Sequence, residues 1–205
     1  MNSTIRAIKQ SDYNFLYHVF ISYKPNIFGY YSTKVYEQCI KMLIDYDDNL
    51  SITTVGEYNG EPKLFMSSIL DCQHYIRELN KYTSFIEKIK MQLISNKAVK
   101  QDSSYVDKEI LTLCSNMYSN YNNSAYGLMQ YRDKDTKDPN MHTLLIEHFK
   151  RLDKHNIKYN IGQIRKENRE SIISSRMNGA KIYSISNIYF SIFDIQDILS
   201  KNNIR

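Results

Sequence analysis

The sequence predicts an α/β protein, a mixed, mostly antiparallel central sheet flanked by helices. Two runs that alternate like strands flank Asn59-Gly60, which is the strongest short hairpin signal. Several other segments repeat apolar residues at helical spacing. The last third of the chain reads strand, helix, strand, helix, strand. These three observations together favour helices packed on a sheet.

The first elements follow from apolar spacing and from turn residues. Thr4 to Ile8 alternates as a short strand, and Ser11 or Asp12 then caps a helix. Pro25 and Gly29 end that helix, and a second helix follows. The two apolar stripes are Phe15, Leu16, Val19 and Phe20 in the first helix, and Val35, Cys39, Ile40, Met42 and Leu43 in the second.

A helical block, residues 74–121, separates the hairpin from the next strand. Residues 74–95 and 106–121 each repeat apolar residues at helical spacing, with Lys and Glu between them. We expect one domain, residues 1–205, with this block as a helical insertion within it. The block is either a lid over a binding site or a helix pair that extends the core or forms a dimer contact.

The last third predicts a candidate site. We expect strands at 125–131, 157–164 and 182–194, and helices at 141–156 and 169–178, the second closed by Gly179. Adjacent strands joined by a crossover helix bind ligands at their carboxyl ends, beside helix starts. The loop at 133–140 is therefore the place where a ligand is expected.

Charge and composition exclude several classes of protein. No apolar run approaches eighteen residues and no secretory signal opens the chain, so we expect a cytoplasmic protein without a membrane partner. The 27 Lys and Arg against 22 Asp and Glu suit an anionic ligand. A nucleic-acid partner is not expected, because no aromatic-basic strand motif accompanies the charge. Three scattered cysteines and unpaired histidines indicate no metal site.

The segment RKENRESIISSRMNGAKIY, residues 165–183, resembles the GCN5-related N-acetyltransferases (GNAT). Members of that family show an Asn after the fifth strand, a small residue three positions on, a Tyr at seven, and Gly-Phe at eleven and twelve. The equivalent positions here are Asn168, Ser171, Ser175, Gly179 and Ala180. Leu144 and Leu145 match the family's paired leucines, while the loop before them, residues 136–141, lacks the family's glycines.

The resemblance implies a GNAT-like acyl-CoA N-acyltransferase fold, with acetyl-CoA held where the fourth and fifth strands splay apart. Helix-start amides at residues 140–143 would bind the pyrophosphate, because these N–H groups are unpaired and the helix dipole is positive there. A backbone N–H at residues 128–130 would stabilise the oxyanion. The implied coenzyme-binding residues are Leu128, Met129, Gln130, Lys137, Asn140, Met141, His142, Thr143, Asn168 and Ser171.

Three catalytic residues are suggested, Ser175, Tyr183 and Glu57, and His142 is a further candidate. Ser175 stands where the family often has a Tyr that protonates the leaving thiolate, and Tyr183 is a substitute for that role. Glu57 and Asp71, at the far ends of the hairpin strands, are candidate general bases, but a solvated charge at a strand end is the favoured explanation of each. His142, at a helix start, would be a neutral imidazole able to act as a base, or simply a surface histidine.

The implied activity is transfer of an acetyl group from acetyl-CoA to a primary amine of a small molecule, for which an amino sugar is one candidate. The helical block would then be a lid over the acceptor. The alternative is a catalytically silent acyltransferase-like module that binds a ligand or a partner, which the missing glycines and Ser175 favour. Either a monomer or a homodimer is compatible with the sequence.

Overall fold

The structure is a computed structural model, and it describes residues 3–23, 33–79, 81, 120–136, 140–185 and 188–202. Its strands are β1 (Ser3–Ala7), β2 (Ser51–Tyr58), β3 (Glu61–Ile69), β4 (Ser124–Arg132), β5 (Tyr159–Arg165), β6 (Lys181–Ile185) and β7 (Ile188–Asp194). Its helices are η1 (Gln10–Asp12), α1 (Tyr13–Tyr23), α2 (Thr33–Asp45), α3 (Cys72–Leu79), α6 (Met141–Lys154), α7 (Arg169–Met177) and α8 (Ile195–Lys201).

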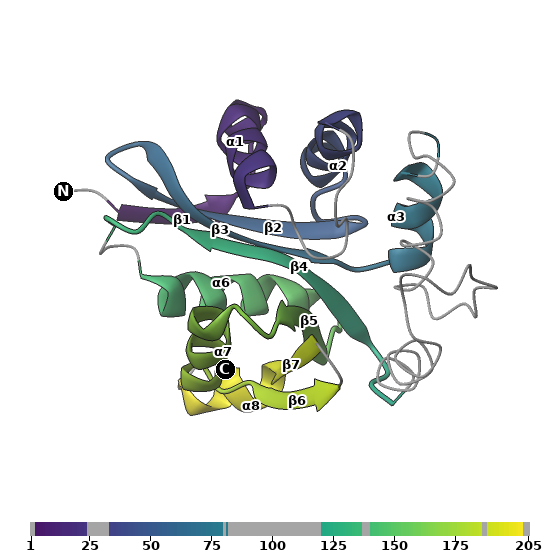
Figure 1. Ribbon diagram of the computed structural model, residues 1–205, viewed down its shortest axis with the longest axis vertical. Helices are drawn as coiled ribbons and strands as arrows, with labels where there is room; N and C mark the ends of the chain where they lie inside the picture. Colours follow the sequence, from purple (N-terminus) through teal and green to yellow (C-terminus); the bar gives the residue numbers. More distant parts are fainter. Residues whose placement is uncertain are drawn as a thin grey trace.

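The seven strands form one sheet in the order β1-β2-β3-β4-β5-β7-β6. Only β4 and β5 run parallel, and the other neighbours are antiparallel. The prediction of a mixed, mostly antiparallel sheet is confirmed. The parallel pair needs a crossover connection, which α6 supplies (Figure 1).

The hairpin of β2 and β3 turns at the dipeptide that the sequence indicated. Asn59 has φ 51° and Gly60 has φ 83°, the left-handed pair that a two-residue type I′ turn needs. Asn tolerates this conformation and Gly adopts it without strain. The turn holds Tyr58 opposite Glu61 and thereby sets the register of the longest ladder in the sheet.

Helices cover both faces of the sheet (Figure 1). On one face α1 and α2 bury their apolar stripes, with Phe20, Tyr36 and Ile40 packed around Phe65 of β3. On the other face α6 and α8 pack Leu144, Phe149 and related side chains against the sheet. The apolar stripes named above for the first two helices are thus those that form the first core, with Phe15 only partly buried.

The end of the chain differs from the prediction. Residues 182–194 were expected to be one strand, but they form two antiparallel strands, with Tyr183 opposite Phe190, and β7 lies between β5 and β6. Apolar alternation continues through both strands, so period alone does not reveal the reversal. The available signal was the pair Ser186-Asn187, because both residue types are common in turns. The helix α8, which Asp194 caps, was not predicted.

Most of the predicted helical block lies outside the described residues. Its described part is α3 together with residues 81 and 120–121, and Tyr75 of α3 donates a hydrogen bond to the carbonyl oxygen of Cys39 at 3.2 Å. The single domain and the insertion stay predictions. Within the described residues, no helix has the length and apolar character needed to cross a membrane.

Candidate functional site

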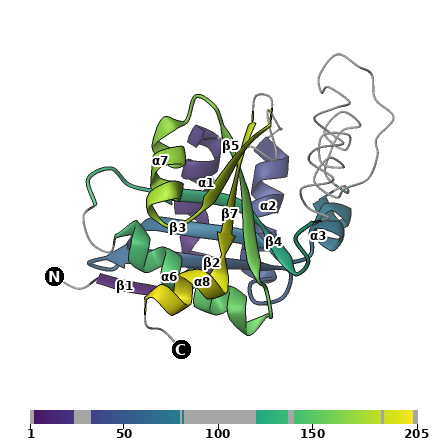
Figure 2. The same ribbon diagram turned by 90° about the horizontal axis from the view of Figure 1, so that it is seen from below.

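The fourth and fifth strands separate halfway along their length. They pair at four positions, from Ser124 opposite Tyr159 to Gly127 opposite Gly162. Beyond these glycines β4 continues beside β3, and β5 continues beside β7, so the two strands diverge. In Figure 2 the direction of β5 and β7 is turned steeply away from that of β2 and β3. Among the described strands, the sheet is therefore open at the parallel seam between β4 and β5, where the resemblance had placed the splay.

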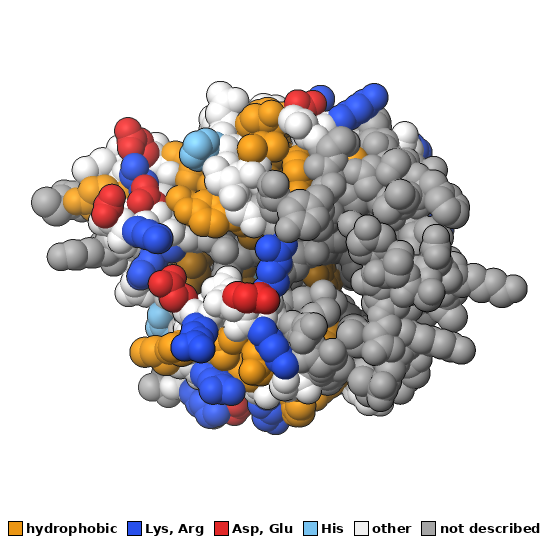
Figure 3. Space-filling view, viewed as in Figure 1, with side chains coloured by type: hydrophobic (Ala, Val, Ile, Leu, Met, Phe, Trp, Pro, Cys, Tyr) orange, Lys and Arg blue, Asp and Glu red, His pale blue; other side chains and the backbone are white. Residues whose placement is uncertain are grey.

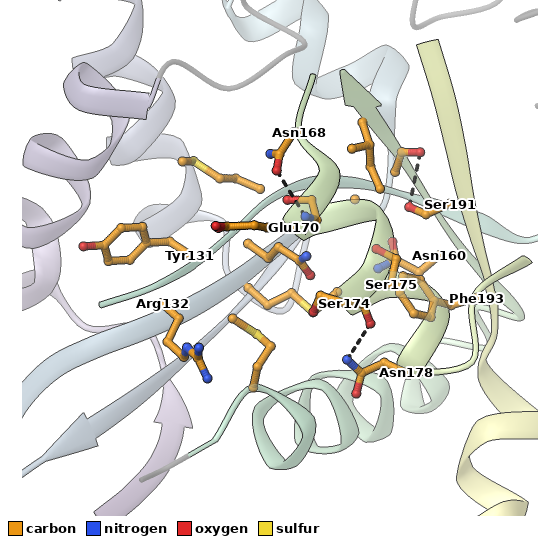
Figure 4. Close-up of a pocket in the computed structure, with 18 of the residues that line it drawn as sticks. Tyr131, Arg132, Asn160, Asn168, Glu170, Ser174, Ser175, Asn178, Ser191 and Phe193 are labelled. Carbon is orange, nitrogen blue, oxygen red and sulfur yellow. Dashed lines mark hydrogen bonds between the residues drawn. The ribbon is translucent and has the colours of Figure 1, made fainter. Parts of the chain in front are cut away.

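A cleft of about 1190 Å³ occupies this opening. Its walls come from β4, β5 and β7, from the first turn of α6, and from one side of α7 (Figure 4). Figure 4 shows Tyr131 and Arg132 on β4, and Asn168, Glu170 and Ser174 on α7. Both helices thus begin at the cleft, which places two helix amino termini beside one cavity.

Two glycines make room at the narrow end of the cleft. A Cβ on Gly127 would lie 3.3 Å from Oδ1 of Asn160, and a Cβ on Gly162 would lie 2.9 Å from Oγ of Ser191. Both distances are shorter than ordinary contacts to a Cβ atom. The polar side chains of Asn160 and Ser191 can line this end because their neighbours on the adjacent strand lack side chains.

A β-bulge shapes the β4 wall. Ser67 pairs with Met129 and Ser68 pairs with Gly127, so Leu128 is the extra residue on β4. Leu128 belongs to the core under α1 and α2, and Met129 packs against the same core. Backbone N–H groups of the 128–130 segment that face away from β3 have no strand partner in the described part of the chain, and these three residues line the cleft.

The start of α6 presents fewer free amides than the sequence suggested. Asn140 caps the helix, and its Oδ1 accepts hydrogen bonds from the Thr143 N–H at 2.8 Å and from the Thr143 hydroxyl at 3.1 Å. The Thr143 amide is therefore occupied, and Thr143 does not line the cleft. Within the described residues, the N–H groups of Met141 and His142 have no partner, and both residues line the cleft. Lys137 lies outside the described residues.

His142 is engaged on both sides of its ring. Its Nδ1 lies 2.9 Å from Oδ1 of Asn178, and its Nε2 lies 3.2 Å from Oδ1 of Asn202. Each amide also donates from Nδ2 to a helix carbonyl oxygen, which turns its oxygen toward the imidazole. Both ring nitrogens are therefore engaged by side-chain amides within the described residues. The role of His142 as a base stays a prediction.

The start of α7 combines a helix cap with the cleft wall. Asn168 accepts a hydrogen bond from the Ser171 N–H at 3.1 Å, and both residues line the cleft. One turn further on, Ser175 is 3% exposed and also lines the cleft. Its hydroxyl has no hydrogen-bond partner among the described residues. The structure thus brings Asn168, Ser171 and Ser175 together with the 128–130 segment.

Glu57 is not in the cleft. Arg6 donates to it from Nε at 2.7 Å and also pairs with Asp12, and Thr4 donates to it at 3.1 Å. The hydrogen bond from Arg6 holds the pKa of Glu57 below its usual value. A carboxylate that is already paired, has a lowered pKa and stands apart from the cleft is a poor general base. Asp71, the other strand-end carboxylate, caps α3 through the N–H of His74 at 2.9 Å.

Tyr183 also lies away from the cleft, on the edge strand β6. A hydrogen bond with Tyr183, together with burial, raises the pKa of Tyr121 to about 12. Tyr121 in turn stacks edge-on against Tyr159, with ring centroids 4.9 Å apart. Tyr183 therefore belongs to a tyrosine cluster with Tyr121 and Tyr159, and it does not line the cleft beside Ser175.

Several lining residues were missed by sequence reasoning. They are Tyr23, Arg132, Lys134, Asn160, Glu170 and Ser191. Asn160 had a signal, because a polar residue inside an otherwise apolar strand core needs a partner. Glu170 is the one carboxylate among the described lining residues, and it is exposed.

The surface beside the cleft is basic. Figure 3 shows Lys and Arg side chains gathered over α7 and β6. The exposed basic residues of these elements and of the turn before them are Arg165, Lys166, Arg169, Arg176 and Lys181. Such a field raises the local concentration of an anionic ligand.

No family model matches the sequence, and a search of curated proteins finds no matching relative. Solved structures do match. The PaiA N-acetyltransferase of Thermoplasma acidophilum, solved with coenzyme A, superposes with TM-score 0.54 at 14% identity, over 95% of this chain and 99% of that one. A Vibrio cholerae spermidine N-acetyltransferase gives 0.56 at 12% identity over 97% of each chain. A GNAT-family acetyltransferase from Staphylococcus aureus gives 0.58 at 10% identity, over 95% and 99%.

These similarities extend over nearly the whole chain. The fold is the acyl-CoA N-acyltransferase fold of the GNAT proteins. The resemblance seen in the sequence is thereby confirmed at the level of the fold.

Proposed function

We propose that this protein is an acyl-CoA-dependent N-acyltransferase, which transfers an acetyl group from acetyl-CoA to a primary amine of a small molecule. The observation that carries the proposal is the open parallel seam between β4 and β5, with a cleft that extends from two helix starts to a pair of glycines. A long, thin ligand with an anionic end and a reactive end suits such a cleft.

The anionic end would lie at the start of α6. The free N–H groups of Met141 and His142 point out of the first turn, where the helix dipole attracts phosphate. Arg132 and Lys134, which also line the cleft, add positive charge. Asn168 and Ser171 at the start of α7 would contact the pantetheine arm from the opposite wall. Lys137, next in the same loop, remains a candidate phosphate contact.

The chemistry needs little more than proximity. The amine nitrogen attacks the thioester carbonyl carbon, the C–N bond forms, and the carbonyl oxygen becomes an oxyanion. The intermediate then collapses, the C–S bond breaks, and the thiolate leaves with the electron pair. Holding the two reactants in place lowers the barrier by up to about 7 to 11 kcal/mol. An N–H of Leu128, Met129 or Gln130 on the free edge of β4 would stabilise the oxyanion.

Two side chains of the cleft wall, Ser175 and Glu170, could take part in the proton transfers of the reaction. Ser175 has an unpaired hydroxyl on the cleft wall and would donate to the leaving thiolate, although a serine hydroxyl is a weaker acid than a phenol. Glu170 is the lining carboxylate that could accept the proton of the attacking amine through water.

The acceptor would enter from the α1 side of the seam. Tyr23 and Tyr131 line the cleft there, with ring centroids 5.2 Å apart. An aromatic wall favours a flat or apolar body, such as a sugar ring, attached to the amine. An amino sugar therefore belongs in the acceptor panel, together with polyamines and amino-acid amides. The lid role of the helical block stays a prediction.

A catalytically silent module is the second candidate. It is favoured by Ser175 in place of a phenol and by the position of Glu57 outside the cleft. Such a module would bind coenzyme A tightly and turn over nothing.

Two measurements test the proposal. Titration calorimetry with coenzyme A and acetyl-CoA tests binding, and absence of heat at millimolar ligand would remove both candidates. Thiol release with the amine panel then separates them, because only the enzyme liberates coenzyme A faster with an amine than without one.

A further inference from the structure

A line of buried hydrogen bonds connects the floor of the cleft with α6. Asn160 is 1% exposed, and its Oδ1 accepts a hydrogen bond from Oγ of Ser68 at 3.1 Å. Oγ of Ser68 lies 2.8 Å from Nε2 of His148, and Nδ1 of that ring lies 3.1 Å from Oγ1 of Thr54. All four side chains are buried. We call Thr54, His148, Ser68 and Asn160 the buried chain.

The protons in the buried chain point one way. Ser68 has a single hydroxyl proton and donates it to Asn160, so Nε2 of His148 must be the donor to Ser68. Burial, and after it the positive charge of Arg151, lower the pKa of His148 to about 3. The ring is therefore neutral at physiological pH, with its proton on Nε2, and Nδ1 accepts from Thr54. The last group of the chain is the Nδ2 amide of Asn160, which has no partner among the described residues.

Both ends of the chain are fixed. At the outer end, Arg151 donates to the carbonyl oxygen of Thr53 at 2.6 Å, pairs with Asp47 at 2.7 Å and lies 3.4 Å from Oγ1 of Thr54. At the inner end, the absent side chain of Gly127 leaves the space beside the Asn160 amide, 3.5 Å from Nδ2 to the position of its Cβ. With Oδ1 bonded to Ser68, Nδ2 is the amide atom left for a ligand, at the place where β4 and β5 part.

We propose that Asn160 is a catalytic residue whose Nδ2 donates a hydrogen bond to the carbonyl oxygen of the bound thioester. This inference rests on the proposed function. A ligand anchored by its phosphates at the start of α6 would reach the narrow end of the cleft with its acyl group. There Nδ2 and a backbone N–H of β4 approach from two strands and together form an oxyanion hole. Thr54, His148 and Ser68 touch no ligand and are positioning residues.

Binding of two ligands of the same shape tests the contact without an acceptor. S-ethyl-coenzyme A replaces the thioester carbonyl of acetyl-CoA by a methylene group. Calorimetry should show that the wild-type protein prefers acetyl-CoA by about three- to tenfold, the range of one neutral hydrogen bond. In Asn160→Asp, which keeps an acceptor for Ser68 but replaces the N–H donor, this preference should fall to the part that the backbone N–H of β4 supplies. Turnover should fall about 10² to 10³-fold, as when one oxyanion donor is lost.

Further variants separate positioning from stability. Ser68→Ala removes the hydrogen bond that Ser68 donates to Asn160, and it should lower the preference for acetyl-CoA. Ser51→Ala is the matched control, because Ser51 is a buried β2 serine whose hydroxyl has no hydrogen-bond partner among the described residues. It should leave the preference unchanged. If Asn160→Asp does not fold, as judged by its melting curve, Asn160→Ala decides by the same two measurements.

The outcomes distinguish the two proposals. A wild-type protein that binds neither ligand refutes the proposed function, and the role of Asn160 with it. Equal wild-type affinity for both ligands overturns the role of Asn160 alone. The same holds if a folded Asn160 variant keeps both the preference and the turnover of the wild type.

Discussion

The narrow end of the cleft depends on a contact that a single methyl group would disturb. Gly162 has no positive φ, so its backbone accepts alanine. In Gly162→Ala, however, the new Cβ would lie 2.9 Å from Oγ of Ser191 and 3.7 Å from the carbonyl oxygen of Gly127. Crowding of this kind costs about 1 to 3 kcal/mol. Alanine in a strand regains about 0.5 to 1 kcal/mol over glycine. We expect a net loss of up to about 2.5 kcal/mol in the free energy of unfolding.

Removing Oγ of Ser191 should restore the stability that Gly162→Ala loses. Ser191→Ala alone breaks only a long hydrogen bond, 3.4 Å to the carbonyl oxygen of Gly162, and should cost less than about 1 kcal/mol. The double variant Gly162→Ala with Ser191→Ala should therefore be more stable than the sum of the single changes by about 1 to 3 kcal/mol.

Urea unfolding followed by circular dichroism measures this coupling, since the chain has no Trp for fluorescence. Gly127→Ala is the matched control, because its Cβ would meet Asn160 and not Ser191. Its combination with Ser191→Ala should be additive within about 0.5 kcal/mol. If the Gly162 and Ser191 changes are additive as well, the close approach deduced at the end of the seam is wrong.

Three further predictions concern single side chains. Asn168→Ala should cost about 1 kcal/mol of stability as a lost cap, and calorimetry should show a weaker affinity for coenzyme A than this loss explains; an unchanged affinity would leave capping as its role. Glu57→Gln should leave turnover unchanged and lower stability by about 1 kcal/mol. The pKa of Glu57 is lowered in the folded protein, so the wild type should be more stable than Glu57→Gln at a pH above the usual carboxyl pKa. This difference in stability should be lost as the pH falls through the pKa of Glu57 in the folded protein. A difference that persists in acid would contradict this. The pKa of His148 is lowered from 6.5 to about 3 in the folded protein, so as the pH falls the unfolded chain binds a proton at this residue before the folded chain does. Unfolding curves should therefore show the free energy of unfolding falling by about 1.4 kcal/mol per pH unit below pH 6.5. His148→Gln should lack this part of the slope.

Local pattern accounts for the elements that were predicted correctly. The turn at Asn59-Gly60, the stripe of α2 and the closure of α7 by Gly179 each depend on residues close together in the sequence. Gly179 has φ 91°, a conformation that glycine adopts readily. The two strands within 182–194 were missed because a period of two carries no information about where a strand reverses.

The site was only partly predictable because its contacts join distant residues. The sequence indicated Asn168 and Ser175 through their spacing within one helix. It did not indicate that Arg6 would pair with Glu57, 51 positions away, and so hold a candidate base outside the cleft. Likewise Ser68 meets Asn160 across 92 positions. Residue type suggests what a side chain can do, whereas the register of the sheet decides which partner it meets.

The parallel seam also sets an order for folding. The β2–β3 turn joins neighbouring residues, Tyr58 and Glu61, and such hairpins close within microseconds. The four pairs between β4 and β5 form only after the chain has passed through α6, so their loop-closure entropy is larger. The pairing of β3 with β4 closes a longer stretch of chain, from Ile69 to Tyr126. We therefore expect the hairpin to form before either of these long-range pairings. A ligand in the cleft would touch β4, β5 and β7, so it would bind only molecules in which the pairing of β4 with β5 is complete.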